Sequence, residues 1–193
     1  MHLNGILQVY SLNSISKNAE KYVDNFSKKG VFLMIICGID PGLSGGIVLM
    51  EGQKLLNFSV MPLNTGKEVC FLKFREVLGD FNPDHVFLER AVPMAMGSKH
   101  AFNYGRGFAA LEIAIQQSGK PVTYVEPAKW SKEIHEGISK DLKAKAKSII
   151  AFERLFPQLK ERVPKSKTGK YHEGILDALL IASYGVRKLS TSE

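Results

Sequence analysis

The chain has 193 residues and a mass of 21.4 kDa, which suits one compact domain, with or without an appendage. Hydrophobic residues make up 45% of it and charged residues 23%, so wholesale disorder is excluded. No apolar run approaches the ~20 residues that a membrane-spanning helix needs, and no membrane association is expected. Cys37 and Cys70 lie in apolar stretches, which favours reduced thiols in a reducing compartment.

The net charge of +7 is concentrated in one segment, residues 140–170. Ten Lys and Arg residues in this segment are opposed by three acids, and this excess of seven equals that of the whole chain. A localised basic zone indicates a polyanionic partner, most simply nucleic acid. The alternative is a solvated, Lys-rich surface.

Residues 1–33 differ in composition from the rest of the chain. They are rich in Asn, Ser and Lys and only weakly periodic, so we interpret them as a variable N-terminal extension, possibly unstructured. They lack the basic and then apolar regions of a secretory signal, and they contain acids that a mitochondrial presequence avoids. Residues 34–193 are expected to form the functional domain.

From residue 34 onward the hydrophobic pattern predicts an α/β fold. The predicted strands cover residues 34–39, 45–50, 55–60, 85–89 and 121–125. The predicted helices cover residues 69–79, 108–117, 142–156 and 175–188. A long loop is expected over 93–106 and a basic linker over 164–170. This order indicates an initial antiparallel meander followed by a parallel part.

Three acidic residues lie where an apolar element ends or begins. Asp40 and Glu89 each end an apolar strand, and Asp177 begins an otherwise apolar helix. Acids that converge in this way form an oxygen-rich pocket of like charge, for which hard Mg²⁺ is the natural counterion. The ordinary alternatives are a turn residue for Asp40 and a helix-start charge for Asp177.

Two further residues near Asp177 are candidate ligands. Glu173 lies four residues earlier, so on a helix the two carboxylates share a face. His172 is adjacent to Glu173 and can ligate a metal as neutral imidazole.

The motifs that carry these acids are Cys37-Gly38-Ile39-Asp40-Pro41-Gly42 with Ser44-Gly45-Gly46, Phe87-Leu88-Glu89-Arg90, His172-Glu173-Gly174 and Asp177-Ala178-Leu179-Leu180-Ile181-Ala182. Together they resemble the RuvC-type Holliday junction resolvases of the RNase H-like superfamily, above all the RuvC-like enzymes of phages and prophages. Those enzymes also show stretches similar to Tyr104-Gly105-Arg106-Gly107 and to Trp130–Lys132. The resemblance covers about residues 34–187.

This resemblance implies a five-stranded mixed sheet flanked by helices. It implies a homodimer that resolves four-way DNA junctions by paired symmetric nicks through two-metal-ion hydrolysis, with Mg²⁺ for which Mn²⁺ substitutes. The expected setting is recombination, repair or phage DNA debranching, in the cytoplasm of a bacterium or a phage-infected host. The helix over 108–115 would be the dimer helix, or else it packs on the sheet.

The resemblance also assigns roles to the acids. Asp40 would bridge both metal ions, and Glu89 and Asp177 would bind one each. Cellular RuvC enzymes place a fourth ligand three residues before the helix Asp, a position that is Gly174 here. His172 or Glu173 must then supply that ligand: Glu173 has the better helical phase, and His172 has precedent as a residue type.

Candidate DNA-binding residues fall into two groups. The first lies in the predicted loop after Glu89 and mixes cations with aromatics: Lys99, Phe102, Tyr104 and Arg106. Such a loop suits splayed bases, and in RuvC-like enzymes the corresponding region inserts an aromatic at the crossover, which favours Phe102 or Tyr104. The alternative is that these aromatics pack beneath the loop. The second group matches the phosphate-binding lysines of RuvC-like enzymes: Lys129, Lys132, Lys143 and Lys147.

The sequence leaves two rivals to a Mg²⁺-dependent crossover junction endodeoxyribonuclease. A YqgF-like RNA nuclease would share the strand acids. A non-catalytic binder of branched nucleic acid would keep the basic zone and lose acids, which this chain retains. Trp130 is expected in the core.

Overall fold

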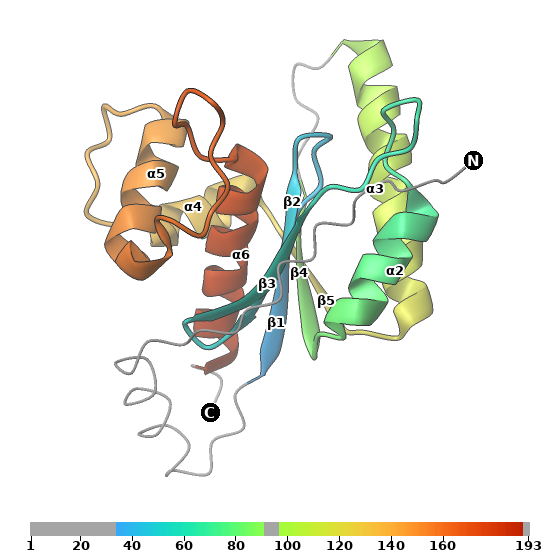
Figure 1. Ribbon diagram of the computed structural model, residues 1–193, viewed down its shortest axis with the longest axis horizontal. Coiled ribbons are helices and arrows are strands. Elements are labelled where there is room, and N and C mark those ends of the chain that lie inside the picture. The colour runs from blue at the N-terminus through green and yellow to red at the C-terminus, as the bar shows by residue number, and fades with distance from the viewer. Residues whose placement is uncertain (1–33, 91–96, 191–193) are drawn as a thin grey trace. The chain divides into compact units, whose positions relative to one another are not determined.

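The computed structural model describes residues 34–90 and 97–190, which belong to one compact unit. Within them, a five-stranded sheet is covered by helices on both faces (Figure 1). The extension predicted for residues 1–33 and the start of the predicted loop, residues 93–96, lie outside the described residues. None of the helices in the described ranges has the length and apolarity needed to cross a membrane.

The sheet has the mixed topology that the element order predicts. Its strands are β1 (Ile35–Asp40), β2 (Gly46–Glu51), β3 (Lys54–Val60), β4 (His85–Glu89) and β5 (Val122–Val125), in the spatial order β3-β2-β1-β4-β5. The first three form an antiparallel meander, and β4 and β5 run parallel to β1. The central strands β1 and β4 are continuous apolar runs because both of their faces are covered. The predicted α/β fold class is confirmed.

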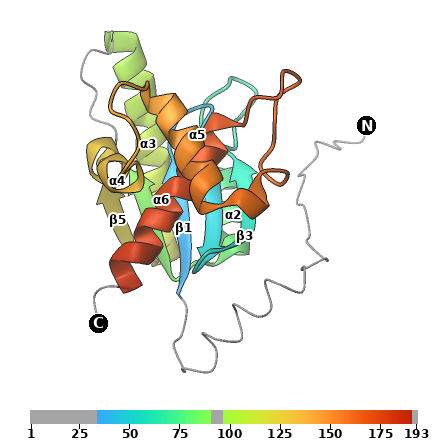
Figure 2. The ribbon, with the colours of Figure 1, turned by 90° about the vertical axis from the view of Figure 1, so that its left-hand side faces the viewer.

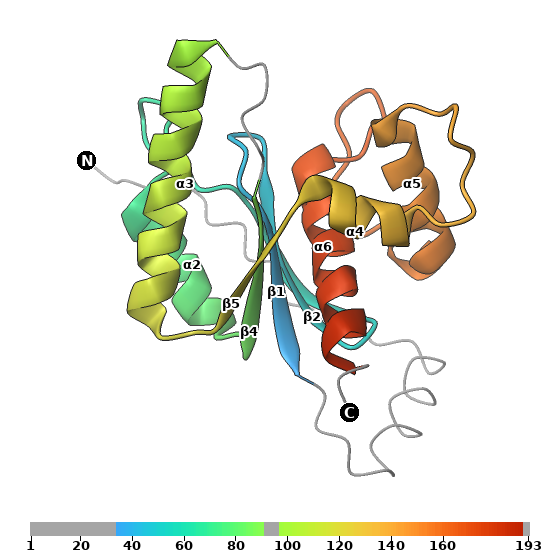
Figure 3. The same ribbon diagram turned by 180° about the vertical axis from the view of Figure 1, so that it is seen from behind.

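The helices form a layer on each face of the sheet. They are α2 (Phe71–Phe81), α3 (Ser98–Ser118), α4 (Pro127–Ile134), α5 (Ala144–Leu155) and α6 (Glu173–Ser190), with a 3₁₀ turn at Pro157–Leu159. Helix α6 lies along one face with α4 and α5 packed on it (Figure 2), and α2 and α3 cover the other face (Figure 3). Each layer encloses its own hydrophobic cluster, one around Phe87 and Leu180 and one around Phe74 and Leu88.

Two expectations about the helices are wrong. Residues 98–106, predicted as a loop, belong to α3, which begins ten residues earlier than the predicted helix. This half of α3 is largely exposed and contains Gly105 and Gly107, so its sequence lacks the apolar periodicity of a packed helix. Helix α4 is absent from the prediction, although Pro127 in its first turn is a typical helix-start signal.

The two cysteines differ in burial. Both Cys37 and Cys70 are free thiols, but only Cys37 is fully buried.

Candidate functional site

Asp40 and Glu89 are the last residues of the neighbouring parallel strands β1 and β4, so they lie at the same end of the sheet. Ile39 is paired with Leu88, so the acid that follows each lies beside the other. Side chains alternate along a strand, and Asp40 therefore shares a face with Gly38, whose Cα approaches α6. Glu89 shares that face with Phe87, which packs in the α6 cluster. Strand register thus directs both acids toward α6.

Glycine contacts bring the N-terminus of α6 against the β1–β2 turn. A Cβ atom at Gly174 would overlap the backbone of Ser44 and Gly45, and one at Gly46 would lie 2.6 Å from the carbonyl oxygen of Gly174. A parallel bridge joins Gly45 to Gly174. Only residues without a side chain permit this approach. It places Asp177, one turn further along α6, near Asp40.

Burial raises the pKa of all three acids, and the charges of neighbouring acids raise it further for Glu89 and Asp177. Burial raises the pKa of Glu89 to about 7, with smaller contributions from the charges of Asp40 and Asp177. Burial also raises the pKa of Asp177 to about 6, and the charge of Asp40 adds to it. The pKa of Asp40 is raised by burial too. These shifts indicate three carboxyl groups that share one poorly solvated site.

The donor set fits a hard divalent cation. No group of three His, Cys, Asp or Glu side chains within the described ranges has the geometry of a preformed metal site. However, Oδ1 of Asp177 is buried and has no hydrogen-bond partner, which is costly unless a ligand occupies it. Neighbouring carboxylates that resist ionisation gain most from a bound cation, and oxygen donors suit Mg²⁺. The residues therefore fit the predicted cofactor.

Glu173 and His172, the two candidates for a fourth metal ligand, each contact other residues of the chain. Glu173 begins α6 and is ion-paired with Lys145 of α5. His172 accepts the backbone N–H of Ile175 through Nδ1 at 3.3 Å, so it caps α6, and it lies close to Asp40. A neutral imidazole that accepts through Nδ1 carries its proton on Nε2. Either residue must therefore change partner to become a fourth ligand.

Trp130 has a second role that the sequence analysis missed. Its side chain is 5% exposed, as expected of a core residue. Its indole N–H also donates a 2.7 Å hydrogen bond to Oε1 of Glu89. A buried Trp usually finds a partner for its N–H, but no spacing in the sequence identifies an acceptor 41 positions away. The bond fixes one carboxylate oxygen and leaves the other available.

Helix α5 contributes two more residues that the sequence analysis did not single out for the site. Lys145 pairs with Glu173, and buried Ser148 lies close enough to Asp177 to oppose the rise in that residue's pKa. The same hydroxyl lies 3.3 Å from Nε2 of His135. Helix α5 therefore lies beside Asp177.

The first group of predicted DNA-binding residues lies on the exposed half of α3, which extends past the end of the strands (Figure 1). Phe102 is 66% exposed, and the guanidinium of Arg106 lies 5.7 Å from the centre of its ring. Arg106 also pairs with Glu68 at 2.9 Å. Tyr104 stacks on Phe108 and is only half-exposed, whereas Lys99 is exposed. Phe102 is therefore the better of the two aromatic candidates.

The second group lies on α4 and at the start of α5. Lys129 pairs with Glu126 at 3.3 Å, and Lys132 is exposed on the same helix. Lys143 is the N-cap residue of α5, and the ammonium of Lys147 donates to the carbonyl oxygen of Lys140 at 2.9 Å.

Comparisons with known proteins concern the fold. No protein-family model matches the chain, and no curated protein sequence matches it. Thermus thermophilus RuvC is similar over 82% of this chain and 98% of its own, with a TM-score of 0.59 and 21% identity. The same protein in complex with a Holliday junction substrate gives 0.57 and 21%, covering 78% of this chain and 92% of that chain. The yeast mitochondrial Holliday junction resolvase gives 0.52 and 12%, over 91% of this chain and 87% of its own. The chain therefore has the RNase H-like fold of the RuvC-type Holliday junction resolvases.

Proposed function

We propose that the chain is a divalent-metal-dependent endonuclease that resolves four-way DNA junctions. The observation that carries this proposal is the meeting of Asp40, Glu89 and Asp177, from three separate segments, at one end of the sheet. The fold shared with structures of Holliday junction resolvases supports the substrate. The proposed setting is recombination, repair or phage DNA debranching in a bacterial or phage-infected cytoplasm.

The mechanism we propose is hydrolysis of a phosphodiester bond at the branch. Asp40, Glu89 and Asp177 would hold two Mg²⁺ ions, with Glu173 or His172 as the fourth ligand. Such ions supply acidity to a water molecule and stabilisation to the leaving oxygen. Trp130 orients Glu89 by holding Oε1, and burial excludes bulk water from the site. We expect 5′-phosphate and 3′-hydroxyl ends, so that a ligase can seal the nicks.

DNA binding is proposed to use the groups on either side of the carboxylates. Phe102 would stack on an unpaired base at the crossover, with Lys99 and Arg106 beside it. Phosphates would bind the lysines of α4 and α5: Lys129, Lys132, Lys143 and Lys147. The high exposure of Phe102 supports this role, because it leaves the ring accessible to a base.

Paired symmetric nicks need two centres, and each chain has one, so we propose a homodimer. Leu111, Ala114 and Ile115 of α3 are buried against the sheet, whereas Ile113 is 49% exposed and Leu72 of α2 is 57% exposed. An open apolar groove of ≈ 440 Å³ lies between these helices and is lined by Phe71, Arg106, Ala109, Ala110 and Ile113. A second copy would cover it. Sedimentation of Ile113→Glu should then show a monomer. In a junction-cleavage assay the same variant should make unpaired nicks.

The test of the function is cleavage of a synthetic four-way junction beside matched duplex, single-stranded DNA and RNA, with and without Mg²⁺. Mg²⁺-dependent, ligatable, paired nicks confined to the junction would establish the resolvase. Cleavage of RNA instead would establish the YqgF-like alternative. Tight junction binding without cutting under any divalent ion would leave a structural binder of branched DNA.

A further inference from the structure

The segment between α5 and α6, predicted as a basic linker, is a closed hairpin. Lys165 and Tyr171 form an antiparallel bridge, and the N–H of Ser166 donates to the carbonyl oxygen of Lys170 at 2.7 Å. The turn is closed by a 2.9 Å bond from Gly169 N–H to the carbonyl oxygen of Ser166. Gly169 has φ +77°, which a residue with a side chain rarely adopts. The segment thus has a defined geometry.

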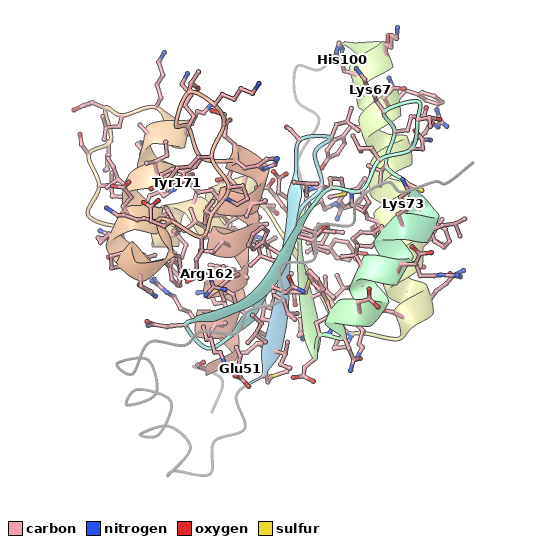
Figure 4. All side chains as sticks on the ribbon, viewed as in Figure 1. Glu51, Lys67, Lys73, His100, Arg162 and Tyr171 are labelled. Carbon is pink, nitrogen blue, oxygen red and sulfur yellow. The ribbon has the colours of Figure 1, made fainter. Side chains whose placement is uncertain are left out.

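The base of this hairpin is fixed to α5. The ring of Tyr171 packs edge-on against Phe152 at 5.1 Å, and its hydroxyl donates to Glu153 at 3.1 Å. The N–H of His172 donates to the carbonyl oxygen of Pro164 at 2.7 Å. Tyr171 lies on the α5 and α6 side of the sheet, away from Lys67 and Lys73 on the other side (Figure 4). The hairpin is therefore anchored to the layer that carries Asp177.

The charges of this region are unevenly neutralised. Lys165 pairs with Glu161 at 3.0 Å, and Lys160 pairs with Glu153 at 3.3 Å. Lys167 and Lys170 are exposed, and within the described part of the chain neither makes an ion pair. Two unpaired cations on a rigid turn, in the most basic segment of the chain, favour a polyanion over plain solvation.

The hairpin also lies near the carboxylate centre, the site formed by Asp40, Glu89 and Asp177. It leads directly into His172 and α6, and in Figure 1 this orange-red loop reaches the end of the sheet at which β1 finishes. Chain geometry limits the distance between the Cα atoms of Lys170 and Asp177 to roughly 16 Å, three extended residues and one helical turn. At 3.4 Å per nucleotide along a duplex strand, that distance corresponds to about five nucleotides.

We propose that the Lys165–Tyr171 hairpin is a DNA-contacting element, in which Lys167 and Lys170 bind phosphates of a duplex arm that leaves the junction. This inference rests on the proposed function, and it extends the DNA interface beyond α3, α4 and the start of α5. The hairpin contacts would position an arm within about five nucleotides of the cut, whatever its sequence, because phosphates carry no base identity.

Salt dependence of binding tests the contact. The full chain is titrated onto a labelled four-way junction in Ca²⁺ at 50–200 mM salt, and log K is plotted against log[salt]. The double variant Lys167→Ala/Lys170→Ala should have a slope shallower by about 1.8, because each phosphate contact on duplex DNA contributes about 0.9. Lys167→Arg/Lys170→Arg should keep the wild-type slope. Lys54→Ala is the control, since Lys54 is exposed and lies across from Glu51 in the β2–β3 register, at the opposite end of the sheet (Figure 4).

A second measurement locates the contact on the DNA. Neutral methylphosphonates placed within about five nucleotides of the cut should weaken wild-type binding and leave the double Ala variant unaffected. An unchanged slope in the Ala variant, with a wild type that binds and cuts junctions, overturns the hairpin contact alone. A wild type that neither binds nor cuts junctions overturns the proposed function and this inference with it.

Discussion

The carboxylate centre and the exposed half of α3 are built in opposite ways. The centre is held by backbone contacts of Gly38, Gly46 and Gly174 and by a buried indole hydrogen bond. The exposed half of α3, residues 98–107, is tied down by the Arg106–Glu68 pair, both of whose side chains are at least half exposed. Such exposed pairs contribute only about 0–1 kcal/mol. Catalysis requires a fixed arrangement of its side chains, whereas a surface that binds bases of any sequence benefits from side chains that can adjust.

Catalysis at the carboxylate centre should respond most strongly to substitution. Asp40→Asn should lower the rate of junction cleavage in Mg²⁺ by at least about 10³-fold, because a metal ion contributes several kcal/mol and each 1.36 kcal/mol is tenfold. Junction binding in Ca²⁺ should persist. Single-turnover cleavage and anisotropy measure the two quantities. Asp80→Asn, at an exposed position of α2, is the control, and cutting retained by Asp40→Asn would remove Asp40 from the site.

The glycine contacts predict a large loss of stability. Gly174→Ala places a Cβ atom against the backbone of Ser44 and Gly45, which cannot move without displacing β2. Overpacking of this kind costs about 1–3 kcal/mol or more, and about 1 kcal/mol lowers the Tm of a domain this size by 2–4 °C. Thermal unfolding of Gly79→Ala is the comparison: that exposed helical glycine has open space around it and should gain stability. Equal Tm shifts in the two variants would contradict the contact.

Trp130→Phe tests the indole hydrogen bond to Glu89. The ring bulk stays, but the donor is lost, and removing a partner of a metal-binding side chain typically lowers metal affinity or activity by about 10–100-fold. We expect a higher half-saturating Mg²⁺ concentration and unchanged junction binding in EDTA. Calorimetric titration with Mn²⁺ gives the affinity independently of cleavage. A variant with normal metal affinity and low stability would reduce Trp130 to a core residue.

Phe102→Ala tests the other region. Because Phe102 is 66% exposed, its loss should leave Tm nearly unchanged. Junction binding should weaken by the ~1–3 kcal/mol that base–aromatic stacking contributes, while binding to plain duplex should be little affected. Anisotropy with both DNAs measures this difference. Equal weakening on junction and duplex would argue against insertion at the crossover.

A last expected change is in how stability depends on pH in the absence of metal. The pKa of Glu89 is raised to about 7 and that of Asp177 to about 6, so the folded chain binds more protons than the unfolded chain above pH 4. Stability should therefore fall as pH rises from about 4 to 7. Tm should fall over the same pH range, and thermal unfolding between pH 4 and 7 measures the fall.

Two controls isolate this contribution from the histidines, whose lowered pKa values act in the opposite direction: His85 and His135. Glu89→Gln should flatten the decline, and so should added Mg²⁺. An identical pH profile for wild type and Glu89→Gln would contradict the raised pKa of Glu89.

The five strands and the positions of their acids follow from local patterns in the sequence. Buried strands are continuous apolar runs, and a strand's period of two fixes which face Asp40 and Glu89 occupy once their neighbours are apolar. The apolar run after Asp177 likewise predicts a buried helix with its acid near the start. These are local signals, and each was read from a few adjacent residues.

Contacts between residues far apart in the chain depend instead on tertiary packing. The bond from Trp130 to Glu89 spans 41 positions, and the pair of Lys145 with Glu173 joins two helices, so neither leaves a periodic trace in the sequence. The exposed half of α3 was misassigned because a helix that buries little has no apolar stripe. The hairpin before α6 also depends on distant contacts. Its charge is evident from composition, but its shape is fixed by the packing of Tyr171 on α5.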